Sequence, residues 1–236
     1  ATGVLHDLQE RPFVVTEVKR RERRKNPFPP FTTSTLQQAA AKRLRFSARR
    51  TMTTAQRLYE GVEMGSQGST GLITYMRTDS TRVAASAVGQ ARDWIEKEMG
   101  RPFLASSPQL YGGRQQKGAQ EAHEAIRPTD VHLHPGEARE FLGGDEADLY
   151  ELIWLRFVAS QMAPAVYDTT TVDFDLEGSS GRKYLFRATG SVVKFPGYTR
   201  LYQEAIESGD HKRLDDLVPL PRMEEGDLSR LKGLQP

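Results

Sequence analysis

Apolar side chains along the middle of the chain recur with the three- and four-residue spacing of helices that bury one face. Thr35 and Gln38 have the spacing of a capping box, so we expect one helix to start at Thr35. The pattern predicts three further helices: one from near Thr51, one over residues 81–99 and one from a cap at Asp145 to Met162. Across four predicted helices, the residues expected to face the interior are Leu36, Ala40 and Leu44; Met52, Ala55, Tyr59 and Val62; Ala84, Val88, Ala91 and Ile95; and Leu149, Leu152, Ile153 and Phe157.

Segments rich in β-branched residues flank this helical region and predict strands. They are residues 11–19, 169–176, 182–189 and 191–195. Three prolines within residues 26–30 break the chain after the first strand, because each proline removes a backbone donor and fixes φ. The expected fold is therefore α+β. A helical domain of residues 27–164 is expected to be inserted into a β-rich domain formed by residues 1–26 and 165–236.

The composition describes an ordinary globular protein. Of 236 residues, 37% are hydrophobic and 27% are charged. The absence of cysteine excludes disulfides and cysteine-ligated zinc. No apolar run approaches the length of about 20 residues that spans a membrane, so we expect no membrane partner. The chain starts without methionine and without a signal peptide, and we expect it to be part of a longer protein.

The net charge of +2 conceals a strong asymmetry. Residues 1–57 hold 13 lysines and arginines against 4 acidic residues, whereas the remainder holds 20 against 27. Basic residues that neutralise phosphates release counterions, which gives salt-sensitive and sequence-independent binding to nucleic acids. The N-terminal quarter is therefore predicted to bind a polyanion, and a solvated charged face is the alternative. Its first basic cluster is Arg20, Arg21, Arg23, Arg24 and Lys25.

Tyr75 lies in an unusually polar segment and is the candidate nucleophile. A phenol has an ordinary pKa of about 10, so a catalytic tyrosine needs a cation or hydrogen bonds that stabilise its phenolate. In an extended segment Arg77 would face the same side as Tyr75, and a guanidinium also matches two oxygens of a phosphate. Thr74 and Thr78 would add hydroxyl donors, and Asp79 would orient the arginine. The alternative is a half-buried tyrosine of an ordinary strand.

Four segments of the chain, in order, resemble sequence blocks of the type IA DNA topoisomerases, and together they are far more specific than any one alone. They are Pro30–Gln37, Thr51–Glu60, Ile73–Ser80 and Ala119–Pro128. The resemblance runs from about Arg11 to the end of the chain, and Met76 in particular is similar to the bacterial topoisomerase I branch. It implies a helical, helix-turn-helix-like tyrosine domain carried by a β-rich arch. It also implies cleavage of one DNA strand through a 5′-phosphotyrosyl intermediate.

The same resemblance assigns further site residues. Gln56 and Glu60 would line the DNA and the catalytic site, His123 would contact the DNA phosphate, and Arg127 would support the site. Considered singly, Gln56 and Glu60 are typical of a solvated helix face, and a lone histidine is more often a packed or solvated residue than a catalytic one. The segment around His123 lacks the pattern of a zinc protease, so no zinc is expected.

The cofactor expected for the whole enzyme is Mg²⁺, held by a separate TOPRIM domain of which this chain shows no trace. The acidic spacing of Asp173, Asp175 and Glu177 imitates the magnesium triad of that domain, but three carboxylates on the solvent face of a strand explain it more simply. We therefore expect no metal in this chain, and no strand cleavage by this chain alone.

The partners that the resemblance implies are single-stranded DNA, negatively supercoiled DNA, and the TOPRIM and other domains of the same enzyme. Relaxation of supercoils would proceed without ATP, in keeping with the lack of a phosphate-binding loop motif. The expected location is the bacterial cytoplasm, at the nucleoid. Two other functions remain open: a single-stranded DNA-binding module without chemistry, in which Tyr75 stacks on a base, and a scaffold for a protein partner.

Overall fold

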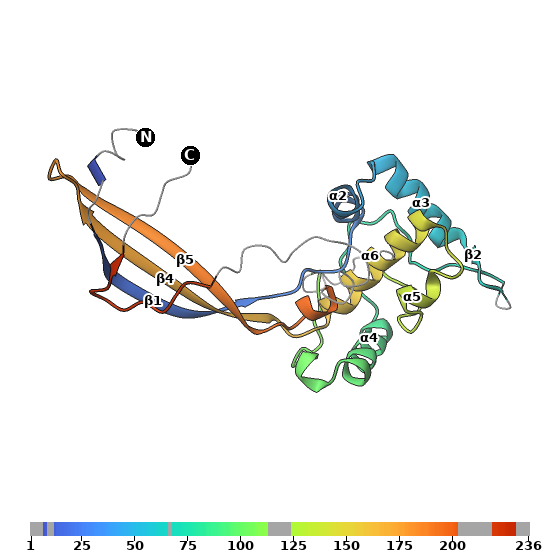
Figure 1. The fold of residues 1–236 in the computed structure, drawn as a ribbon. Helices are drawn as coiled ribbons and strands as arrows, with labels where there is room; N and C mark the ends of the chain where they lie inside the picture. Colours follow the sequence, from blue (N-terminus) through green and yellow to red (C-terminus); the bar gives the residue numbers. More distant parts are fainter. Residues whose placement is uncertain (1–6, 9–11, 66–67, 113–123, 203–218, 230–236) are drawn as a thin grey trace. The chain divides into compact units, whose positions relative to one another are not determined.

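The structure is a computed structural model that describes residues 7–8, 12–65, 68–112, 124–202 and 219–229. Helices and an antiparallel sheet are both present, which confirms the predicted α+β class. The chain divides into two compact units, one built on a sheet and one mainly helical (Figure 1). The sheet unit comprises Ala1–Lys25, Ala165–Pro196 and His211–Pro236, and the helical unit comprises Asn26–Pro164 and Gly197–Asp210.

The division differs from the expected boundary after the last long strand. Residues 197–202 group with the helical unit, although the sequence assigned everything from residue 165 onward to the β-rich domain. The physical reason is local pairing: the backbone N–H of Tyr198 donates to the carbonyl of Ala163 at 2.9 Å. Both Tyr198 and Leu201 are buried.

Three long strands and one short strand form the sheet (Figure 1). They are β1 (Phe13–Lys25), β4 (Ala165–Glu177), β5 (Lys183–Phe195) and β6 (Leu228–Ser229). The order is β5-β4-β1-β6, and every neighbouring pair is antiparallel. Two predictions at the strand level were wrong. β1 continues to Lys25, so the first basic cluster is part of the sheet, and β5 passes through Gly190, which keeps its pairing with Thr170.

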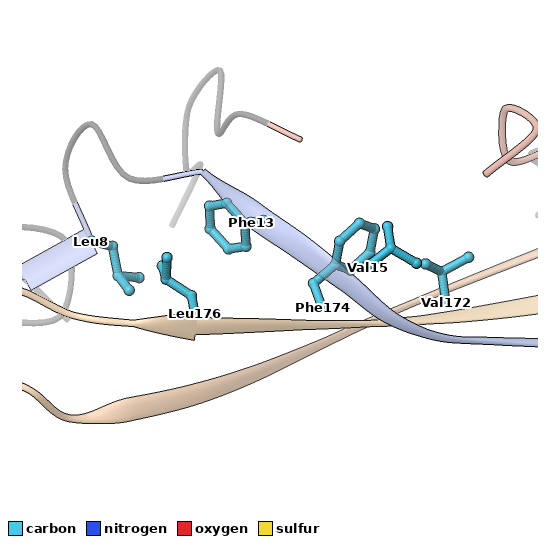
Figure 2. Packing of buried hydrophobic residues seen from close by; sticks show 6 residues of the cluster. All are labelled: Leu8, Phe13, Val15, Val172, Phe174 and Leu176. Atoms are coloured by element: carbon cyan, nitrogen blue, oxygen red, sulfur yellow. The ribbon is translucent and has the colours of Figure 1, made fainter. Parts of the chain in front are cut away.

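One face of the sheet carries the apolar core of this unit. Figure 2 shows six of its side chains together on that face, and they are Leu8, Phe13, Val15, Val172, Phe174 and Leu176. The register between β1 and β4 shifts between Val15 and Glu17. The shift inserts one extra residue into β1. Such a β-bulge moves each following side chain of β1 to the other face of the sheet. Val18 therefore pairs with Val172 and packs against the same core.

Among its described residues, the helical unit has four helices of more than ten residues: α2 (Thr33–Arg43), α3 (Ala48–Glu60), α4 (Ala85–Glu98) and α6 (Gly144–Ser160). A two-stranded hairpin of β2 (Val62–Glu63) and β3 (Ser69–Thr70) follows α3. A 3₁₀ turn, η2 (Arg101–Phe103), follows α4, and a short helix, α5 (Pro135–Ala138), precedes α6. Among the described helices, none is long and apolar enough to cross a membrane.

The helix starts differ from the predicted caps. Thr32, not Thr35, caps α2, and the two threonines form a reciprocal capping box. At α6, Glu146 accepts the backbone N–H of Gly143 at 3.0 Å, while Asp145 lies inside the first turn. Asp145 instead accepts two hydrogen bonds from Arg50 of α3, at 2.7 and 2.6 Å. These bonds hold the pKa of Asp145 below its ordinary value.

One expected helix face and one expected helix start were partly wrong. Ala55 is buried as predicted, but Tyr59 is 41% exposed, and the buried face of α3 also holds Thr51, Thr54 and Leu58. α4 begins at Ala85 rather than at residue 81. Hydroxyl groups satisfy the preceding backbone instead: Ser80 N–H donates to Thr78 Oγ1, and Arg82 N–H donates to Ser80 Oγ, each at 3.1 Å.

Trp154 of α6 is at the centre of the helical core and is fully buried. Its indole N–H donates to the carbonyl of Val131 at 2.9 Å. Its ring packs edge-to-face against Trp94 of α4, with 4.8 Å between centroids, and against His134 at 5.1 Å. The predicted buried stripe of α6 is confirmed, since Leu149, Leu152, Ile153 and Phe157 are all buried.

Candidate functional site

The segment that carries Tyr75 is held on one side by the backbone near Arg127. Thr74 N–H donates to the carbonyl of Arg127 at 2.9 Å, and Arg127 N–H donates to Thr74 Oγ1 at 3.0 Å. The Thr74 hydroxyl donates to the carbonyl of Ala125 at 2.7 Å, and Ile73 forms a β-bridge with Pro128. Thr74 is therefore an anchor for the segment.

The other side of the segment is held by the first turn of α2. Thr33 N–H donates to the carbonyl of Thr78 at 2.9 Å, and Thr78 N–H donates to Thr33 Oγ1 at 2.9 Å. The Thr33 hydroxyl in turn donates to the carbonyl of Met76 at 2.8 Å. Met76 and Thr78 are buried, so the fixed backbone turns the alternate residues Tyr75, Arg77 and Asp79 outward.

Tyr75 is 45% exposed and packs against a second exposed tyrosine. The rings of Tyr75 and Tyr59 meet edge-to-face, with 5.4 Å between centroids. Among the described residues, the Tyr75 hydroxyl has no hydrogen-bond partner. On α3, the amide of Gln56 donates to the carboxylate of Glu60, which fixes this pair one residue from Tyr59. The exposed phenol is thus oriented by an aromatic contact and open to an incoming group.

A cavity of about 440 Å³ lies next to this segment. It is lined by Thr32, Thr33, Ser34, Arg77, Thr78 and Asp79. Within the described residues, the guanidinium of Arg77 makes no ion pair with Asp79 or any other carboxylate. The lining therefore offers a free cation and several hydroxyls, a donor set that suits a phosphate group. No role was predicted for residues 32–34, although they lie in one of the segments that resemble the family.

Arg127 is a scaffold residue in this structure. Its guanidinium donates two hydrogen bonds to Glu124, at 2.9 and 3.0 Å, and one to the carbonyl of Pro128 at 2.9 Å. Glu124 also accepts the backbone N–H of Ala84 at 2.6 Å, just before α4. No role was predicted for Glu124, although its position three residues before Arg127 is a common spacing for an ion pair. His123 lies outside the described residues.

The described residues provide no metal site. Nowhere among them do three histidine, cysteine, aspartate or glutamate side chains gather closely enough to hold an ion. In β4, Asp173 accepts two hydrogen bonds from Arg187 of β5, each 2.7 Å long, which hold the pKa of Asp173 below its usual value. A carboxylate held in this way is not free to bind Mg²⁺, so the residues present do not fit that ion.

Gly71 allows the backbone of the segment that carries Tyr75 to lie close to the backbone of α3. A Cβ added there would lie 2.7 Å from the carbonyl oxygen of Tyr59. We expect Gly71→Ala to destabilise the helical unit by about 1–3 kcal/mol in urea unfolding, because the backbone must shift. Gly89→Ala on α4 is the matched control, with no atom within 4 Å of its Cβ. It is expected to stabilise by about 0.5–1 kcal/mol, and equal signs for the two changes would contradict the packing described here.

Comparison with known proteins gives consistent matches over nearly the whole chain. The sequence model of a family described as DNA topoisomerase matches residues 1–235. DNA topoisomerase 1 of Xylella fastidiosa strain Temecula1 is 44% identical over 213 residues, which are 90% of this chain and 26% of that protein. The strain 9a5c protein matches equally. The full-length topoisomerase I structure from Thermotoga maritima has a TM-score of 0.77 at 37% identity, covering 97% of this chain and 34% of that one. The chain thus spans about a quarter of the length of these curated relatives.

Proposed function

Because this chain belongs to the family of bacterial type IA DNA topoisomerases, we propose that Tyr75 is the nucleophile that cleaves and rejoins one DNA strand. The observation that carries the proposal is the exposure of the phenol two residues from Arg77, which lines a polar cavity and has no carboxylate partner among the described residues. Tyr75 is 45% exposed, and Arg77 contributes to the lining of that cavity. Both residues extend from a backbone that is hydrogen-bonded on two sides.

The proposed reaction exchanges one phosphodiester for another. The Tyr75 oxygen bonds to the phosphorus of the scissile phosphate as its proton departs. The bond from phosphorus to the 3′ oxygen then breaks, and that oxygen takes up a proton as a 3′ hydroxyl. The product is a 5′-phosphotyrosyl linkage of similar bond energy, so resealing needs no ATP. Arg77 would stabilise the charge that develops on the phosphate oxygens.

The other predicted site residues have supporting roles in this proposal. Thr74 and Arg127 hold the tyrosine segment, and Thr78 closes its contact with α2. Gln56 and Glu60 present a polar pair beside Tyr59. His123 remains a predicted phosphate contact. Mg²⁺ and the rest of the strand-binding surface are proposed to come from other domains of the same enzyme, which would relax negative supercoils at the bacterial nucleoid.

A second candidate function is favoured by the exposed pair of aromatic rings. Tyr59 and Tyr75 are 41% and 45% exposed, and such rings form platforms on which bases stack. A single-stranded DNA-binding module without chemistry would use the same two residues. The two functions differ in one requirement, since transesterification needs the Tyr75 hydroxyl and stacking needs only the ring.

The decisive experiment mixes this chain with a separately produced TOPRIM-containing segment of a family member, Mg²⁺, and a 3′-labelled single-stranded oligonucleotide. Cleavage through a 5′-phosphotyrosyl bond would transfer the label to this chain in a form that survives denaturation. The chain alone is expected to give no adduct. Salt-sensitive DNA binding without an adduct, despite demonstrated assembly of the two proteins, would favour the binding module.

A further inference from the structure

The strand register sorts the first basic cluster onto two faces of the sheet. After the bulge near Val15, the even-numbered residues of β1 share the face of Val18 and the apolar core. The odd-numbered residues occupy the opposite face. We call the four basic residues of that face the β1 stripe, which consists of Lys19, Arg21, Arg23 and Lys25.

The β1 stripe is exposed along its whole length. Lys19 forms an ion pair with Glu17 at 2.5 Å. Among the described residues, Arg21, Arg23 and Lys25 have no carboxylate partner. Of the carboxylates that β4 adds to this face, Asp173 accepts two hydrogen bonds from Arg187, and Asp175 and Glu177 lie further along the strand from the stripe. Within the part of the chain that the structure describes, three of the four stripe cations therefore keep their charge unpaired.

Hydroxyl groups continue the same face beside the stripe. Thr169 pairs with Arg21 and shares a hydrogen bond of 3.0 Å with Ser191 of β5. Thr171 pairs with Lys19 and shares one of 3.3 Å with Thr189. These side chains form two rungs of a ladder across β4 and β5. In each rung one hydroxyl donates to the other, so the second hydroxyl can still donate a hydrogen bond to an anionic oxygen.

The spacing of the stripe selects the kind of anion. Residues two apart on a strand are about 6.6 Å apart, so the four cations cover roughly 20 Å in nearly equal steps. This step is close to the separation of successive phosphates along an extended single strand, whereas the phosphates of a duplex wind around its axis. A point anion would use one or two of these groups and leave the others unpaired.

We propose that this face of the sheet is a second nucleic-acid surface, on which the β1 stripe and the hydroxyl ladder hold the backbone of a single DNA strand. The surface belongs to the sheet unit and uses no residue of the tyrosine site. It shares only its ligand class with the proposed function, and it stands or falls independently of Tyr75. The contacts are to phosphates, so binding is independent of base sequence.

The test compares two double substitutions on the same strand. Arg21→Thr/Arg23→Thr removes two charges from the stripe, and Arg20→Thr/Arg24→Thr removes two charges from the opposite face. Threonine favours strands, and circular dichroism verifies that both variants remain folded. The full chain is titrated with a fluorescein-labelled oligothymidylate, and the anisotropy is followed over a series of NaCl concentrations.

The stripe variant is expected to lose two phosphate contacts. At about 0.7 released counterions per contact with a single strand, the slope of log K against log salt should fall by roughly 1.4, or about 25-fold in affinity near 0.1 M salt. The opposite-face variant should stay within about twofold. Equal losses in the two variants would reduce the effect to net charge and overturn the proposal.

Three further outcomes would also overturn it. An unchanged slope in the stripe variant would leave the stripe as a solvated face or a site for an acidic protein. A duplex competitor that displaces the oligothymidylate as well as a single strand does would refute the single-strand geometry. Loss of the same binding in Tyr75→Phe would place it at the tyrosine site. A Tyr75→Phe chain that still binds through the stripe but forms no adduct is the expected result.

Discussion

Tyr75→Phe is expected to abolish the denaturation-resistant DNA adduct, because it removes the attacking oxygen. The rate of adduct formation should fall by roughly 10⁴-fold or more. The ring and its edge-to-face contact with Tyr59 are retained. Among the described residues, the Tyr75 hydroxyl makes no hydrogen bond, so the free energy of unfolding should change by less than about 0.5 kcal/mol. Affinity for single-stranded DNA should remain within about twofold.

Tyr59→Phe is the matched control for this experiment. It removes the hydroxyl of Tyr59, whose ring is similarly exposed. The centroids of the Tyr59 and Tyr75 rings are 5.4 Å apart. Adduct formation should persist in this variant at close to the original rate. An adduct that survives in Tyr75→Phe would exclude Tyr75 as the nucleophile. An adduct that disappears equally in both variants would show that the hydroxyls act in binding or assembly rather than in the chemical step.

Trp154→Ala is expected to destabilise the helical unit by about 3–5 kcal/mol, because it leaves a large cavity in a fully buried position. It also deprives the Val131 carbonyl of its donor and removes the edge-to-face contact with Trp94. Typical domains unfold at a cost of about 5–15 kcal/mol, so this single change is expected to bring the unit close to unfolding.

Urea unfolding followed by tryptophan fluorescence measures this effect in the correct unit. The chain has two tryptophans, Trp94 and Trp154, and both belong to the helical unit, so Trp94 reports on its unfolding in the variant. Leu110→Ala is the control, since Leu110 is in the same unit and 80% exposed. It should change the free energy by less than about 0.5 kcal/mol. A loss below about 1 kcal/mol in Trp154→Ala would contradict a central role for this side chain.

Much of the fold followed from local patterns. The buried stripe of α6 was predicted correctly because apolar residues recur there with helical spacing over several turns. Errors arose where side chains compete for backbone groups. Thr35 was taken for a cap, but Thr32 precedes it and shares the capping box, and hydroxyls around Ser80 delay the start of α4. Such choices depend on partners that spacing does not reveal.

The candidate site shows the same limit. The polar residues around Tyr75 and Arg77 were visible in the sequence. The two-residue spacing of Tyr75 and Arg77 predicted that their side chains lie on the same side of an extended segment. The contribution of Thr33 was not predictable, because it lies 43 positions before Met76 and reaches it only after folding. Tyr59 was expected in the core by helical spacing, yet the tertiary structure leaves its ring exposed against Tyr75.

The α+β class, most of the helical and strand segments, the asymmetry of charge and the motif that indicates the family could all be predicted from the sequence. These properties depend on residue types and on their spacing along the chain. Which groups meet and which face water became clear only in the folded chain. A bulge near Val15 determines which arginines of β1 share the face of the apolar core, and backbone pairing with residues 125–128 and with α2 turns Tyr75 outward. Register and long-range hydrogen bonds of this kind depend on segments that are distant in the sequence, so local pattern does not determine them.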